Sequence, residues 1–211
     1  MTTEEIKATL ESVKALITDS HIVYTSGMHG SAYINKDALY PHTEKISALC
    51  AEIAHRFAKE APDAVIAPAL GGIILSQWTA HHLTYMLERQ VYGVYAEKVE
   101  DGGFVIKRGY DKLIQGKKVL VVEDVVTTGG SVKKVIEQIR KIGADVIGVC
   151  VLANRGAVTA DDIGGVPRLD ALLEVTLDAW NEADCLLCKQ GIPINIEVGK
   201  GREYLVRKNI S

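Results

Sequence analysis

The chain has 211 residues, enough for one domain with a full hydrophobic core, and 47% of them are apolar. Its formal net charge of −3 provides no basic field that would favour nucleic acid or a membrane surface. No run of about 18 apolar residues predicts a transmembrane helix, and the acidic start lacks the features of a signal peptide, so we expect a cytoplasmic protein.

The first forty residues predict a helix followed by a segment broken by glycines. Thr2 and Glu5 have the spacing of a capping box, and the helix that they begin has an apolar stripe formed by Ile6, Leu10, Val13 and Ile17. Residues 21–36, HIVYTSGMHGSAYINK, predict two short strands around a turn.

From residue 43 onward, helices and strands alternate. We expect helices over 43–60, 73–87 and 131–143, and strands over 63–70, 90–98, 117–124, 144–155 and 169–177. The first of these helices has one apolar face, formed by Ile46, Leu49, Ile53 and Phe57. The last has Gly143 as its stop signal and faces the core with Val132, Val135, Ile136, Ile139 and Ile142. Residues 99–116 are polar and rich in glycine, which predicts a hairpin or a mobile loop. The middle strands are apolar along their whole length, which is typical of a parallel sheet covered on both faces.

Three loops follow strands of this predicted sheet: ALGG at 69–72, EDVVTTGG at 123–130 and NRGA at 154–157. Ligands of parallel sheets bind beyond the carboxyl ends of the strands, so we expect the three loops to form one site. Replacing Asp124 by asparagine should then leave the fold largely intact, because Asp124 is expected in a loop.

The middle loop has the composition of an anion-binding turn. In TTGGS, residues 127–131, glycines allow close backbone approach, hydroxyls add donors, and the following helix offers its positive end to a phosphate. Glu123 and Asp124 would repel that phosphate unless they face sugar hydroxyls or Mg²⁺. A plain strand-to-helix turn remains the alternative. Walker-type and dinucleotide-binding motifs are absent from the sequence.

The stretch VLVVEDVVTTGGS, residues 119–131, closely resembles the phosphoribosyl-diphosphate (PRPP) motif of type I phosphoribosyltransferases. Further segments resemble the orotate phosphoribosyltransferases among them, in the same order as in that family: 26–35, 67–76, 96–110, 151–157 and 185–194.

This resemblance implies an α/β type I phosphoribosyltransferase fold, with a central mostly parallel sheet flanked by helices. Residues 1–211 would form a single domain, with a small N-terminal hood at about 1–40, a PRPP-binding core at about 41–175 and a C-terminal tail at about 176–211. The implied reaction transfers the phosphoribosyl group from PRPP to orotate, giving orotidine 5′-monophosphate in pyrimidine biosynthesis. The resemblance also implies Mg²⁺ and a homodimer, with no nucleic-acid or membrane partner.

The resemblance also assigns roles to individual residues. Glu123 and Asp124 would hold the ribose hydroxyls and, with Lys98, form the catalytic group. Arg155, Thr127 and Tyr33 would contact orotate. Mg²⁺ would be held mainly by PRPP, with no direct side-chain ligand. The full PRPP-binding set would be Glu123, Asp124, Val125, Val126, Thr127, Thr128, Gly129, Gly130, Ser131, Lys98, Lys107, Arg108 and Gly71.

Some positions depart from the family pattern. Thr25 and Gly71 stand where many members have lysine, and the segment 96–110 has fewer cations than the usual catalytic loop. The PRPP motif is common to phosphoribosyltransferases for different bases, so two other functions stay open: a phosphoribosyltransferase for another base such as a purine, and a regulator that binds PRPP without catalysis.

Cys185 and Cys188 have C-x-x-C spacing, but no second pair and no suitably spaced histidine follows them. Reduced structural thiols are therefore favoured over a metal site or a redox pair.

Overall fold

The computed structural model describes residues 1–175 and 178–210, and the chain forms two compact units. The larger unit comprises Met1–Ile6 and Tyr40–Val175. The smaller unit comprises Lys7–Leu39 and the described residues of the segment 176–211.

The larger unit is built around a six-stranded sheet with the order β10-β9-β8-β5-β6-β7. Adjacent strands are parallel, except that β7 runs antiparallel to β6. The mostly parallel sheet expected from the sequence is therefore confirmed. Its strands are β5 (Ala64–Pro68), β6 (Tyr92–Lys98), β7 (Phe104–Val105), β8 (Lys118–Val126), β9 (Asp145–Asn154) and β10 (Leu169–Glu174).

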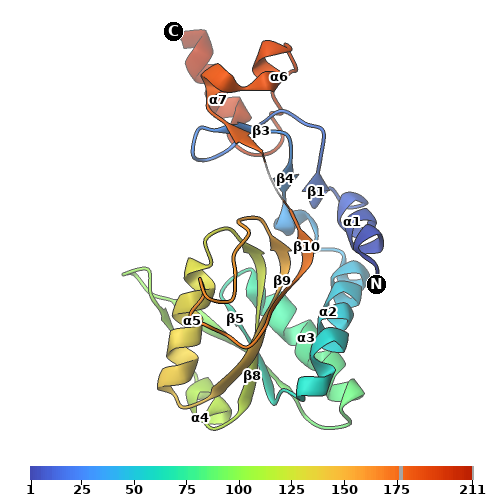
Figure 1. The fold of residues 1–211 in the computed structure, drawn as a ribbon, viewed down its shortest axis with the longest axis vertical. Coiled ribbons are helices and arrows are strands. Elements are labelled where there is room, and N and C mark those ends of the chain that lie inside the picture. The colour runs from blue at the N-terminus through green and yellow to red at the C-terminus, as the bar shows by residue number, and fades with distance from the viewer. Residues whose placement is uncertain (176–177, 211) are drawn as a thin grey trace. The chain divides into compact units, whose positions relative to one another are not determined.

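Helices cover both faces of this sheet (Figure 1): α5 (Gly130–Lys141) lies on one face, and α2 (Thr43–Phe57) and α3 (Gly72–Met86) lie on the other. The apolar stripes predicted for α2 and α5 are buried, except that Ile142 follows the end of α5 and is half-buried. These helices cover the sheet, which explains why β5, β8 and β9 are buried along nearly their whole length. A short 3₁₀ turn, η2 (Ala58–Glu60), extends α2. Gly143, with φ of +80°, follows the end of α5 as the stop signal that the sequence predicted.

The segment 99–116 was expected to be a hairpin or a mobile loop, and its strand β7 forms a hairpin with the preceding β6. It also contains a short helix, α4 (Tyr110–Ile114), that the sequence did not predict. The polar, glycine-rich composition of this segment gave no helical signal, although the buried Ile114 anchors one turn of helix there.

Strand β8 extends the predicted strand 117–124 by two residues and corrects the expectation that the loop already begins at residue 123. It continues through the acidic pair to Val126, because β9 is long enough to pair with it as far as Asn154. Glu123 and Asp124 thus belong to the sheet, and the loop begins only at Thr127.

Helix α1 (Thr3–Glu11) begins with the predicted capping box: the Thr2 N–H donates to Glu5 Oε2 at 2.8 Å, and the Glu5 N–H donates to Thr2 Oγ1 at 3.2 Å. Ile17 was expected on this helix and instead lies in β1 (Leu16–Ile17). The helix ends at Glu11, and Lys14 then adopts a left-handed conformation.

The smaller unit contains two small antiparallel sheets. One pairs β1 with β4 (Tyr33–Ile34), and the other has the order β11-β3-β2, from β2 (Ile22–Val23), β3 (His29–Gly30) and β11 (Ala179–Trp180). Strands β2 and β3 confirm the turn predicted within 21–36. The remaining elements are η1 (Lys36–Ala38), η3 (Glu182–Asp184), α6 (Leu186–Lys189) and α7 (Gly201–Ile210).

The strand predicted at 169–177 ends at Glu174, and residues 176 and 177 lie outside the described residues. Among the helices of the described chain, none has the length and apolar character needed to cross a membrane.

Candidate functional site

A cavity of about 200 Å³ opens where β8 ends and α5 begins. The first N–H groups of a helix have no partner within that helix, so α5 directs its positive end toward this cavity. The lining residues are Glu123, Val125, Val126, Thr127, Thr128, Gly129, Gly130, Ser131 and Val132. They include every residue of the predicted phosphate-binding turn.

Gly129 gives the turn its shape. Its φ is +71°, and a Cβ atom at this position would lie 2.5 Å from Ile163 Cγ2 and 3.1 Å from Val158 Cγ1. Both the left-handed backbone and the lack of space therefore require glycine here.

The acidic pair beside this turn is buried and held in place. Asp124 is 4% exposed: its Oδ1 accepts a hydrogen bond from the Val125 N–H at 2.6 Å, and its Oδ2 accepts one from the Tyr40 hydroxyl at 3.0 Å. Glu123 is 8% exposed, and its Oε1 accepts from the Asp124 N–H at 3.1 Å. Sequence reasoning missed Tyr40, because nothing local connects a tyrosine to a carboxylate 84 positions away.

The loop after β9 packs against the same turn. The Arg155 N–H donates to the Val126 carbonyl at 2.8 Å, and a Cβ atom on Gly156 would lie only 1.7 Å from the Thr127 carbonyl oxygen. Buried Asn154 closes the loop with two bonds to the Val158 backbone, each 3.0 Å long. The loop that carries Arg155 is thus packed against the turn that carries Thr127. Asn154 is a further residue that sequence reasoning overlooked, although it directly precedes the predicted arginine.

The loop after β5 also reaches this end of the sheet. Gly71 precedes α3, and a Cβ atom on the next residue, Gly72, would lie 2.5 Å from Ala67 Cβ and 3.6 Å from Glu123 Oε1. The peptide bond between Ala69 and Leu70 is cis. The three loops expected to share a site therefore meet around Glu123 and Thr127.

The three predicted cations lie on or near the β6–β7 hairpin, and none of them is among the residues that line the cavity. Lys98 ends β6, and Lys107 and Arg108 follow β7, all with exposed side chains. Arg108 Nε donates to Glu97 Oε1 at 2.5 Å, and this bond raises the pKa of the arginine above its usual value. The remaining predicted residue, Tyr33, is a half-buried residue of β4 in the smaller unit.

Comparison with known proteins agrees with this geometry. The sequence profile of the phosphoribosyl transferase domain matches residues 36–183. The chain is 41% identical over 195 residues to the orotate phosphoribosyltransferase of Pelotomaculum thermopropionicum, covering 92% of this chain and 95% of that protein. It is 39% identical over 188 residues to the orotate phosphoribosyltransferase of Thermotoga maritima, covering 89% and 94%.

A solved structure shows the same fold. The orotate phosphoribosyltransferase of Aeropyrum pernix matches with a TM-score of 0.61 and 24% identity, over 88% of this chain and 97% of that one. The domain match, the extended similarity to named relatives and the shared fold lead to one conclusion: the chain belongs to the orotate phosphoribosyltransferase family of type I phosphoribosyltransferases.

Proposed function

We propose that this protein transfers the 5-phosphoribosyl group of PRPP to orotate, releasing pyrophosphate and forming orotidine 5′-monophosphate for pyrimidine biosynthesis. The observation that carries the proposal is the cavity at the end of β8, where a Thr/Gly turn adjoins two buried carboxylates. The extended similarity to orotate phosphoribosyltransferases supports orotate as the base.

The turn 127–131 binds the 5′-phosphate of PRPP. Thr127, Thr128 and Ser131 supply hydroxyl donors, Gly129 supplies the tight turn, and Gly130 begins α5. The backbone of Val125 and Val126 completes the wall of this cavity.

Glu123 and Asp124 bind the ribose. A carboxylate accepts hydrogen bonds and never donates them when ionised, which matches the two hydroxyls of a ribose diol. Tyr40 and the Val125 N–H orient Asp124 before substrate arrives, so less ordering is needed when PRPP binds.

Orotate is bound by Arg155, Thr127 and Tyr33. The planar guanidinium of Arg155 matches a carboxylate or an imide edge in a bidentate manner, and its loop is already packed on Thr127. Tyr33 contributes an aromatic face for the pyrimidine ring.

In the reaction, N1 of orotate loses its proton and forms a bond to C1 of PRPP while the bond from C1 to the pyrophosphate oxygen breaks, so that pyrophosphate and the proton leave. Lys98, Lys107 and Arg108 offset the charge that develops on the leaving pyrophosphate, and Gly71 lets the loop after β5 approach it. Closure of the segment that carries these cations excludes water and prevents hydrolysis of PRPP.

Mg²⁺ would be held mainly by the oxygens of PRPP itself and would supply further charge neutralisation there. The two carboxyl groups beside the cavity would favour a cation nearby without serving as its direct ligands.

We expect the enzyme to be a cytoplasmic homodimer with one continuous functional domain per chain. Light scattering after size exclusion tests the oligomeric state.

Orotate absorbance, followed over time with purified protein, tests the proposed reaction. Loss of orotate that requires protein, PRPP and Mg²⁺ together supports it. Binding of PRPP without loss of orotate would contradict it, and the same assay with adenine, guanine and hypoxanthine would then identify a different base. A gel shift at low salt tests the non-catalytic regulator.

A further inference from the structure

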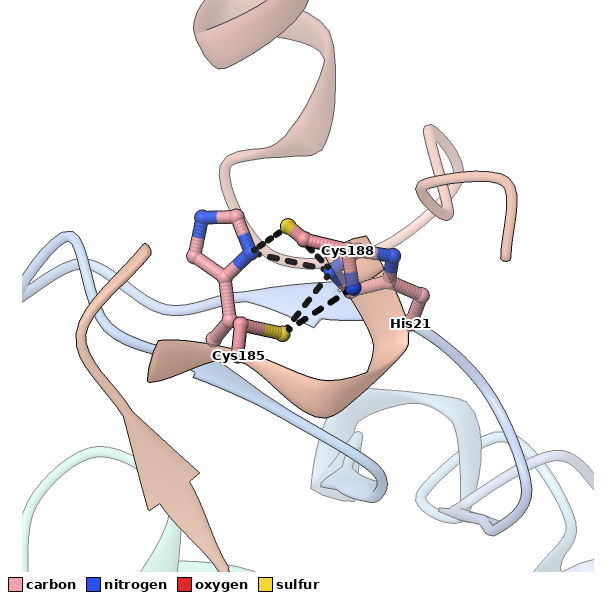
Figure 2. A group of neighbouring side chains, drawn as sticks. His21, Cys185 and Cys188 are labelled. Atoms are coloured by element: carbon pink, nitrogen blue, oxygen red, sulfur yellow. Dashed lines mark hydrogen bonds between the residues drawn. The ribbon is translucent and has the colours of Figure 1, made fainter. Parts of the chain in front are cut away.

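Four side chains that can bind a metal meet within the smaller unit. His21 directly precedes β2, His29 lies on β3, Cys185 caps the start of α6, and Cys188 lies within that helix. One ligand atom from each lies within 4.8 Å of all the others. Figure 2 shows the side chains of His21, Cys185 and Cys188 pointing toward one another. His21, His29 and Cys185 are at most 2% exposed.

Two of the four distances match the edges of a coordination tetrahedron, and the other two are shorter by about 0.3–0.4 Å. Zinc with Zn–S bonds of about 2.3 Å and Zn–N bonds of about 2.0–2.1 Å gives edges of about 3.6 Å between sulfur and nitrogen and about 3.3 Å between two nitrogens. Here His21 Nε2 lies 3.6 Å from each sulfur, and His29 Nδ1 lies 3.3 Å from Cys188 Sγ. The two ring nitrogens are 2.9 Å apart.

Hydrogen bonds alone do not account for this arrangement. His21 Nδ1 lies 2.7 Å from the Ile192 carbonyl, which can only accept, so Nδ1 carries the proton and Nε2 has a single lone pair. Three groups converge on that lone pair: two thiols and His29 Nδ1. One cation at their centre would accept a lone pair from each of the four atoms.

The surroundings also have the features that support metal ligands. A bond from the non-ligating nitrogen of His21 to a backbone carbonyl fixes its ring and tautomer. The Asn195 N–H donates to the His21 carbonyl at 2.7 Å, so the tail residues 192–195 hold this histidine on both sides. The Cys188 N–H donates to Cys185 Sγ at 3.4 Å, which fixes the position of this sulfur. Tyr204 of α7 lies edge-on to the His29 ring.

We propose that His21, His29, Cys185 and Cys188 bind one structural Zn²⁺ ion. Two sulfurs and two imidazoles in a tetrahedron are the ligand set that zinc prefers, and four protein ligands leave no open position for catalysis. This replaces the reading of Cys185 and Cys188 as plain structural thiols. Sequence reasoning looked for histidines after the C-x-x-C pair, whereas His21 precedes Cys185 by 164 positions.

The ion would stabilise the smaller unit. The smaller unit joins two segments from opposite ends of the sequence, has roughly 70 residues, and has only short strands, so its hydrophobic core needs a supplementary link. Zinc would join the hairpin that carries SGMHG to the C-terminal tail. Loss of the ion should therefore loosen this unit while leaving the six-stranded sheet folded.

Metal analysis of the full-length protein tests the proposal without reference to activity. We expect about one zinc per chain after purification from zinc-supplemented culture and dialysis against metal-free buffer. Cys188→Ser and His29→Ala should each lose most of this zinc, whereas the matched control Cys50→Ala, which removes a buried thiol of α2, should keep all of it.

A variant that failed to fold would lose zinc for an unrelated reason, so the decisive measurement uses the wild-type chain. After removal of zinc, added Co²⁺ should produce the visible bands of tetrahedral, thiolate-bound cobalt, and added Zn²⁺ should abolish them. Wild-type protein that contains no zinc and binds Co²⁺ without thiolate bands would overturn the proposal, and the four residues would then be a hydrogen-bonded cluster.

Discussion

Replacing Gly129 by alanine tests whether the phosphate-binding turn is shaped as the structure indicates. The left-handed backbone costs an L-residue about 1–2 kcal/mol, and forcing a methyl group into occupied space costs about 1–3 kcal/mol more. The added Cβ lies 2.5 Å from Ile163 Cγ2, so turn and neighbour must separate by about 1 Å to reach ordinary contact. We therefore expect Gly129→Ala to lose about 2–5 kcal/mol of stability, and kcat/KM for PRPP to fall about 100-fold.

Gly143→Ala is the matched control. Gly143 has a φ of +80°, close to that of Gly129, but nothing lies within 4 Å of its added Cβ. The Gly143→Ala variant should therefore lose only the stability that a left-handed backbone costs an L-residue, about 1–2 kcal/mol. Its kcat/KM for PRPP should stay unchanged. Urea unfolding measures the stabilities, and orotate absorbance measures the kinetics. Equal destabilisation of the two variants, with unchanged KM for PRPP in both, would refute the steric argument.

Further changes probe the residues around this turn. Gly156→Ala places a Cβ 1.7 Å from a backbone oxygen, so kcat/KM should fall at least about 100-fold with both substrates; unchanged kinetics would show that the two loops are not coupled. Tyr40→Phe removes a hydrogen bond to a carboxylate worth about 1.5–3 kcal/mol, which should raise KM for PRPP at least about tenfold in initial-rate measurements. Asp124→Asn should abolish turnover and also destabilise the fold by about 1–3 kcal/mol in urea unfolding, because the buried amide cannot accept from both donors. Arg155→Lys should raise KM for orotate about tenfold and leave KM for PRPP unchanged; the reverse pattern would move this residue out of the base site. Burial raises the pKa of the Cys50 thiol to about 12, so thiol reagents at neutral pH should leave it unmodified until the protein unfolds, as mass spectrometry would show.

The expectation that Asp124→Asn would spare the fold rested on a position in the loop 123–130, although the strand predicted at 117–124 already included this residue. The structure places Asp124 inside β8, so we now expect the change to destabilise the fold. The position of Asp124 inside β8, at 4% exposure and between two donors, makes the carboxylate part of the packed sheet.

Residues near one another in sequence were enough to determine much of this protein. The apolar runs predicted buried parallel strands, the helical stripes of α2 and α5 predicted the buried faces, and Thr2 with Glu5 predicted a helix start. The order of acidic pair, hydroxyls and glycines at 123–131 indicated a phosphate site and the family. Each of these signals comes from residues that are close together in the chain, where backbone geometry restricts which secondary structure can form.

The tertiary structure alone decided which distant residues meet. Tyr40 reaches Asp124, Gly156 touches Thr127, and His21 meets Cys185 only because the order of strands and the joining of the two chain ends place them together. No periodicity encodes such pairs, since each depends on how whole elements pack. The local sequence therefore determined the Thr/Gly turn at 127–131, whereas packing between distant segments determined what orients Asp124 and what gathers four potential metal ligands in the smaller unit.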